Sequence, residues 1–70
     1  MKARTDWRIT RLPDGRVIEK WWDRYSRNWI CQLLDAQDNQ IGSAVIVGCK
    51  ADAMHTSLAH FGENAHAEQL

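Results

Sequence analysis

Apolar residues occur in short runs along the first two thirds of the chain, and polar turn residues separate these runs. Short runs rich in β-branched and aromatic residues, divided by Gly, Pro, Asn and Asp, are typical of antiparallel strands. We predict four strands in two consecutive hairpins, with residues 7–47 forming one sheet. After Gly48 the apolar residues change to a helical period.

The first predicted hairpin has strands over 7–12 and 16–22, and Pro13-Asp14-Gly15 separates them. Proline sets the backbone angle of the first turn position, and glycine accepts a positive φ, so this tripeptide predicts a tight turn. Residues 23–28 are polar and short enough to connect neighbouring antiparallel strands, which gives a simple meander. Residues 1–6 are polar, and we expect them to be frayed.

The stretch 28–47 predicts the second hairpin, with apolar runs over 29–34 and 41–47. Asp38 and Asn39 lie between the runs. Both residue types tolerate the left-handed conformation, so we expect them at the turn centre. β-branched residues dominate the second run, which favours a strand over a helix.

The register of this hairpin has two solutions. A two-residue turn would set Cys31 opposite Ile46 and Leu33 opposite Ala44, whereas a slip of one residue would regroup the faces. Under either register both faces stay largely apolar, although a hairpin with one solvated face should alternate more cleanly. We therefore expect both faces to be covered, one by the helix and the other by more of the chain, a partner or a second copy.

Residues 50–61 predict an amphipathic helix, because their apolar side chains recur at the spacing of one helical face. These side chains are Ala51, Met54, Leu58 and Phe61. Gly62 is a natural residue to follow a helix end, and residues 63–70 continue as helix or form a loose tail. The fold class is thus α+β: an antiparallel sheet of about four strands, followed by one C-terminal helix packed on one face.

Seventy residues form a single small domain. A chain of this size buries only about 60% of its unfolded surface, so a homodimer would supply what the core lacks. Two cysteines cannot build a disulfide framework, and we expect two reduced thiols in a cytoplasmic protein. No apolar run approaches the roughly 20 residues of a membrane span, so no membrane partner is expected.

The net charge is zero, but the charges are unevenly placed. Residues 1–27 hold eight basic and four acidic residues, whereas residues 28–70 hold one basic and five acidic residues. Such asymmetry can orient a partner or a second subunit. The competing interpretation is that the basic side chains are simply solvated.

Basic and aromatic residues interleave in the first half of the chain. Trp, Tyr and Arg dominate protein-binding hot spots, and they also stack on bases and contact phosphates. Adjacent Trp21 and Trp22 must point to opposite faces of a strand, so one of them is available for a partner unless all tryptophans fill the core. The candidate interaction residues are Trp7, Arg8, Arg11, Arg16, Lys20, Trp21, Trp22, Arg24, Tyr25 and Arg27.

The sequence shows no pattern of residues that indicates catalysis, a cofactor, a metal or a small-molecule substrate. His55, His60 and His66 lack the spacing at which two ligands share one helical turn. Cys49 could lie at a helix N-terminus, where the pKa of a thiol falls, but no base accompanies it. We therefore predict no catalytic residue, no cofactor and no metal site.

These patterns predict a small non-enzymatic protein-interaction module, such as an accessory or inhibitor protein. It would dock on a larger complex through an aromatic and arginine-rich face of the sheet. The alternative is a nucleic-acid-binding protein that uses the Arg- and Trp-rich N-terminal half. The near-neutral pI weighs against this alternative, because dedicated nucleic-acid-binding domains usually have a pI above about 9.

Overall fold

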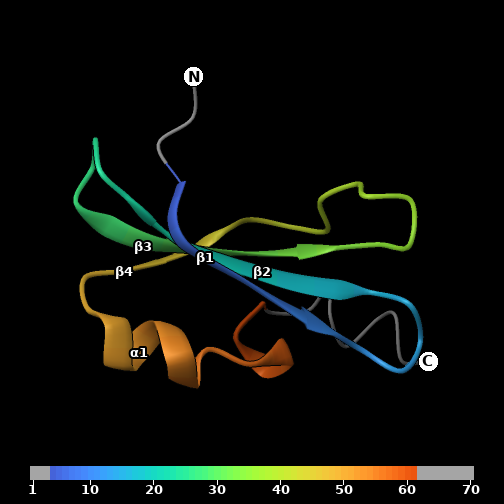
Figure 1. Ribbon diagram of the computed structural model, residues 1–70. Helices are drawn as coiled ribbons and strands as arrows, with labels where there is room; N and C mark the ends of the chain where they lie inside the picture. Colours follow the sequence, from blue (N-terminus) through green and yellow to red (C-terminus); the bar gives the residue numbers. More distant parts are fainter. Residues whose placement is uncertain (1–3, 62–70) are drawn as a thin grey trace.

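The computed structural model describes residues 4–61, which form a four-stranded antiparallel sheet followed by two short helical segments. The sheet contains β1 (Arg4–Arg11), β2 (Val17–Asp23), β3 (Asn28–Leu34) and β4 (Val45–Val47), in their order along the chain. The helix α1 (Lys50–His55) and the 3₁₀ helix η1 (Leu58–Phe61) both lie on one side of the sheet (Figure 1). The predicted α+β fold is confirmed.

The first hairpin turns where Pro13-Asp14-Gly15 predicts it. Gly15 has a φ of 96°, a conformation that residues with a side chain rarely adopt. The Leu12 N–H donates to the Arg16 carbonyl at 2.8 Å and closes the turn. The Asp14 carboxylate also accepts the Arg16 backbone N–H, at 3.0 Å.

The second hairpin has the slipped register. Cys31 lies opposite Val45, and Ile30 lies opposite Ile46. The register predicted for a two-residue turn, with Cys31 opposite Ile46, is therefore wrong. The strand predicted over 41–47 is also shorter, because β4 contains only its last three residues.

The loop between β3 and β4 pairs Leu34 with Gln40, and the pairing shifts once more before Val45. The Asp35 carboxylate accepts the backbone N–H groups of Gln37 and Asn39, both at 2.9 Å, and so closes a loop longer than two residues. Asp38 has a φ of 69° and supplies the left-handed position that we expected there. A second left-handed residue, Gly42 with a φ of 68°, precedes β4.

Alternate residues of β3 form the centre of the core. Trp29, Cys31 and Leu33 are buried, and the residues between them are half-buried on the opposite face. Ala53 of α1 and Phe61 of η1 complete the buried cluster. The expectation that one face of this hairpin packs against the helical segment is thus confirmed.

Trp21 and Trp22 point to opposite faces, as a strand requires. Trp22 pairs with Trp29 on the helix side, where the ring centroids lie 6.4 Å apart at an interplanar angle of 58°. Trp21 pairs with Ile30 on the other side. Only one tryptophan of the doublet therefore contributes to the core.

The prediction of one continuous helix over 50–61 is wrong in its second half. Thr56 has extended backbone angles (φ −66°, ψ 122°), so α1 ends at His55 and η1 follows as a separate turn. The buried face of α1 also differs from the predicted one, since Ala53 rather than Ala51 lies in the core. At the other end, β1 begins at Arg4, so part of the segment expected to fray belongs to the sheet. The tail expected over 63–70 lies outside the described residues.

Lys20 fixes the end of α1 to the sheet. This residue is buried, and its ammonium group donates to the Thr56 carbonyl at 2.7 Å and to the Met54 carbonyl at 3.4 Å. These carbonyls lie at the C-terminal end of α1, where the helix dipole attracts positive charge. A lysine that the sequence suggested as a surface contact thus stabilises the packing of the helix.

We expect Lys20→Met to lower the free energy of unfolding by about 2 kcal/mol, since hydrogen bonds to a charged group contribute about that much. Methionine keeps the apolar stem and removes only the donor. Urea denaturation measures the change. Arg24→Met, at an exposed position, is the matched control and should change stability by less than about 0.5 kcal/mol. Equal losses in both variants would contradict the bonding role of Lys20.

The two cysteines are free, with Cys31 buried and Cys49 exposed. Desolvation raises the pKa of the Cys31 thiol, which keeps this group protonated at neutral pH. We therefore expect a thiol reagent such as Ellman's reagent to label one cysteine quickly in the native protein and the second only after denaturation. Cys49→Ser should abolish the fast reaction. Two fast-reacting thiols in the native wild type would show that the Cys31 side of the core opens readily.

Candidate interaction surface

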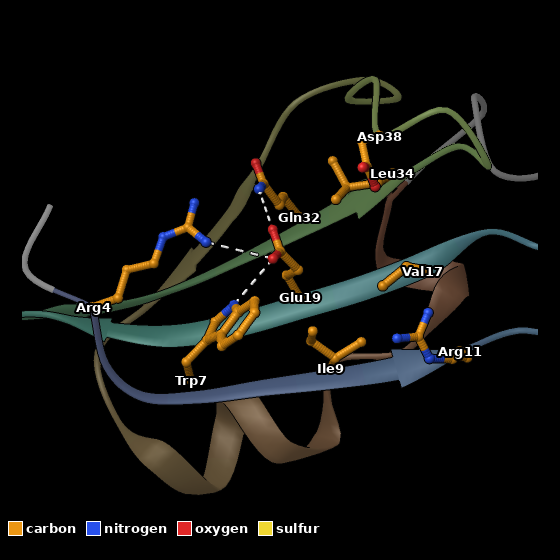
Figure 2. Close-up of a pocket in the computed structure, with 9 residues that line it drawn as sticks. All are labelled: Arg4, Trp7, Ile9, Arg11, Val17, Glu19, Gln32, Leu34 and Asp38. Carbon is orange, nitrogen blue, oxygen red and sulfur yellow. Dashed lines mark hydrogen bonds and ion pairs between the residues drawn. The ribbon is translucent and has the colours of Figure 1, made fainter.

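The sheet face away from α1 and η1, defined as the open face, contains a groove of about 550 Å³. Figure 2 shows the side chains that line it, which come from β1, β2, β3 and the loop after β3. They are Arg4, Trp7, Ile9, Arg11, Val17, Glu19, Gln32, Leu34 and Asp38. The groove therefore combines apolar side chains with charges of both signs.

Three large apolar side chains of this face are exposed. Trp7, Ile9 and Ile46 are 51%, 41% and 60% exposed, respectively. Ile46 belongs to the open face because it lies directly opposite Ile30, which in turn lies opposite Trp21. We expected this face to be apolar and aromatic. That expectation holds for the periphery of the face, whereas the centre of the face is polar.

A bulge in β1 brings Arg4 and Trp7 onto the same face. Thr5 and Arg8 of β1 both pair regularly with β2, but two residues of β1 lie between them opposite the single residue Trp21. The positive φ of Asp6 (56°) accommodates the extra residue. Trp7 is in step with Ile9 on the open face, and the extra residue brings Arg4 to the same face, where regular alternation would put it on the other side.

The carboxylate of Asp6 secures the bulge. It accepts hydrogen bonds from the Arg8 guanidinium at 3.1 and 3.2 Å, and its other close contact is Lys50 Nζ at 3.3 Å. Desolvation acts to raise the pKa of Asp6, but the bonds from Lys50 and Arg8 lower it overall. The bulge is thus anchored to the start of α1 by an ionised side chain.

Glu19 forms the polar centre of the open face. Its side chain is only 10% exposed, although it lies on the face away from α1 and η1. Glu19 Oε2 accepts the Trp7 indole N–H at 3.0 Å, and Oε1 accepts a Gln32 amide N–H at 2.7 Å (Figure 2). A buried carboxylate requires such donors, because burial without them would be strongly unfavourable.

Arg4 provides the third contact of this carboxylate. Its guanidinium NH1 lies 3.4 Å from Glu19 Oε2. The same guanidinium lies over Trp21, with its central carbon 4.3 Å from the ring centre, and 6.0 Å from the ring centre of Trp7. Glu19 of β2 therefore connects side chains of β1 and β3.

The turn between β2 and β3 presents a second group of exposed residues. Asp23 organises it, since its carboxylate accepts the Ser26 hydroxyl at 2.7 Å and contacts the backbone N–H groups of Tyr25 and Ser26 at 3.4 Å. The bond from the Ser26 hydroxyl holds the pKa of Asp23 below its ordinary value. Arg27 adopts a left-handed φ of 58°, and Tyr25 is 81% exposed.

The ten residues predicted from sequence do not form one surface. Trp7, Arg11 and Trp21 lie on the open face, and Arg8 is exposed beside the bulge. The other six lie elsewhere: Arg16 and Lys20 are buried, Trp22 packs against the core, and Arg24, Tyr25 and Arg27 extend from the β2–β3 turn. The basic half of the chain is thus divided among separate regions.

The sequence reasoning missed the residues that hold the open face together. Glu19, Gln32 and Arg4 were not among the candidates, because isolated polar residues in a predicted strand look like solvated positions. The alternation of β2 and β3 gave one usable signal. Glu19 and Gln32 are polar interruptions on the otherwise apolar second face of the central strands, and they lie directly opposite each other.

No protein-family model matches the chain, and neither a curated protein nor a solved structure matches it. Within residues 4–61, no group of three His, Cys, Asp or Glu side chains is placed to hold a metal ion. The helices of this part of the chain are all too short and too polar to span a membrane. Function therefore has to be argued from the open face itself.

We expect Glu19→Ala to lower the free energy of unfolding by about 2 to 3 kcal/mol, because it leaves the donors of Trp7 and Gln32 without an acceptor. Asp38→Asn, which removes an exposed charge of the same groove and keeps a residue type that tolerates the left-handed φ of this position, should change stability by less than about 0.5 kcal/mol. Thermal or urea denaturation followed by circular dichroism measures both. If the two variants are equally stable, the Glu19 contacts do not organise this face.

Proposed function

We propose that the chain is a small non-enzymatic module that binds another protein through the open face of its sheet. One observation carries the proposal: Trp7, Ile9 and Ile46 are exposed on the same face as the groove, while the helical segments cover only the other face. Exposed apolar patches bordered by polar residues are typical of protein-binding surfaces.

The rigidity of the groove floor supports this proposal. Trp7 is tied to Glu19 and lies on a bulge that Asp6 anchors, so its indole is held in place before a partner arrives. Pre-organised aromatic side chains lose little conformational freedom on binding and therefore contribute more affinity. Aromatic residues and arginine are also the types that most often dominate the binding energy of an interface.

Nucleic-acid binding is the second candidate, and the observation that favours it is the β2–β3 turn. Arg24, Tyr25 and Arg27 are exposed there together, and such residues can stack on bases and contact phosphates. The groove weighs against it, because carboxylates lie among its basic residues. A steep fall of oligonucleotide affinity with salt concentration would favour this candidate.

The test compares protein capture by wild type with that by a double variant, Ile9→Lys with Ile46→Lys. Both positions are exposed, so the fold should persist, whereas two charges on an apolar contact surface should weaken binding at least about tenfold. The control is Arg24→Ala with Tyr25→Ala at the β2–β3 turn. The measurement is a quantitative pull-down from the native host with each purified chain as bait.

We expect wild type and the turn variant to capture the same host protein, and the double lysine variant to fail to capture it. Capture that is lost only in the turn variant would contradict docking by the open face. Light scattering at micromolar concentration identifies the special case of a homodimer, which the double lysine variant should convert to a monomer. A wild type that stays monomeric excludes self-association, and a failure of wild type to capture any protein as well would contradict the proposal.

A further inference from the structure

The guanidinium of Arg4 occupies a small cage on the open face. Its central carbon lies 4.3 Å from the ring centre of Trp21 and 6.0 Å from that of Trp7. Its NH1 nitrogen lies 3.4 Å from Glu19 Oε2 (Figure 2). Aromatic rings and a carboxylate around one cation form an arrangement that suits guanidinium and ammonium ligands.

The walls of this cage are held more firmly than its occupant. Trp7 and Gln32 bond to Glu19 at 3.0 and 2.7 Å, whereas the Arg4 contact of 3.4 Å is long for a charge-assisted hydrogen bond. The Nε of Arg4 is buried and has no hydrogen-bond partner within residues 4–61. The carboxylate is therefore pre-positioned for a cation, and Arg4 satisfies it only in part.

Arg4 also lies in a part of β1 that can separate from the sheet. Arg4 and Thr5 make the last two pairs with β2 at this end, and the bulge divides them from the regular pairing that begins at Arg8. Terminal pairs beyond an irregularity open more easily than the interior of a sheet. Release of Arg4 would expose the Trp21 ring and the Glu19 carboxylate beside the groove.

We propose that this cage binds an arginine side chain of a partner protein, and that Arg4 is its internal occupant in the free chain. The site presupposes the protein docking proposed above and names one of its contacts. A guanidinium suits the cage better than an ammonium group, because its flat shape stacks on an indole and its paired N–H groups match a carboxylate.

Arg4 then acts as a built-in competitor. The apparent affinity of a ligand falls with the fraction of chains in which its site is open. If Arg4 fills the cage about nine-tenths of the time, an external guanidinium binds about tenfold more weakly than to an empty cage. Removing the Arg4 side chain should therefore reveal the site.

The experiment titrates N-acetyl-arginine amide into ¹⁵N-labelled wild type and Arg4→Ala and follows the indole N–H signals by NMR. We expect Arg4→Ala to bind this probe about tenfold more tightly than wild type. The signals of Trp7 and Trp21 should shift, whereas those of Trp22 and Trp29 on the helix side should not. The dispersion of the four signals reports directly whether each variant is folded.

Two further variants test the chemistry in the Arg4→Ala background. Glu19→Gln keeps an acceptor oxygen for Trp7 but removes the negative charge, and it should weaken the probe at least about tenfold. Trp21→Leu removes the stacking ring and serves as the second variant if Glu19→Gln unfolds. N-acetyl-lysine amide should bind more weakly than the arginine probe.

The proposal is overturned if Arg4→Ala shows no saturable shift of the Trp7 and Trp21 signals. Unchanged affinity after loss of the Glu19 charge or the Trp21 ring, or equal binding of the lysine probe, overturns it as well. These titrations contain no partner protein, so a negative result leaves the docking of the open face intact. A cage that binds the probe on a chain that captures no protein would leave the guanidinium site standing and overturn the proposed function, and with it the assignment of the site to a partner protein.

Discussion

The structure depends on how β2 buries two adjacent charges of opposite sign on opposite faces of one sheet. A buried charge is tolerated only where hydrogen-bond partners replace the lost water. Lys20 finds them in the last carbonyls of α1, which attaches the helix to one face. Glu19 finds them in Trp7, Gln32 and Arg4, which fixes the other face. One dipeptide thus organises both layers of the molecule.

The two faces of the sheet therefore differ in character. The helix side has a small apolar core, with Cys31 and Leu33 at its centre, and it supplies the stability of the fold. The open face has a polar centre with apolar residues around it, so it is well ordered without a second layer of helices. A face with a hydrogen-bonded centre and exposed apolar side chains, which neither α1 nor η1 covers, has much of its geometry in place before any partner binds.

Short-range patterns in the sequence were sufficient for the fold. Alternation and the Pro13-Asp14-Gly15 turn predicted the meander, and the change of period predicted the C-terminal helix. The errors arose where a local signal competed with a specific contact. The Asp35 carboxylate closes a longer loop than the Asp38-Asn39 turn, and the extended Thr56 ends the helix that the apolar stripe continues.

The site was harder to predict than the fold, for a physical reason. Arg4 joins Trp7 on the open face only because of the bulge at Asp6, and no residue pattern indicates that an aspartate will adopt a positive φ. Glu19 becomes a buried centre only through donors that come from other strands. The interleaved arginines and tryptophans correctly indicated the N-terminal half of the chain. Pairing across strands, however, determines which of these side chains contact each other.

The bulge in β1 has a further consequence for solubility. β1 is an edge strand of eight residues, and a long regular edge would be a template for pairing with other chains. The bulge interrupts its row of backbone groups, and Arg4, Arg8 and Arg11 place like charges along it. The opposite edge, β4, is only three residues long. Both edges thus have features that oppose sheet extension by another chain, beside a face that exposes apolar side chains.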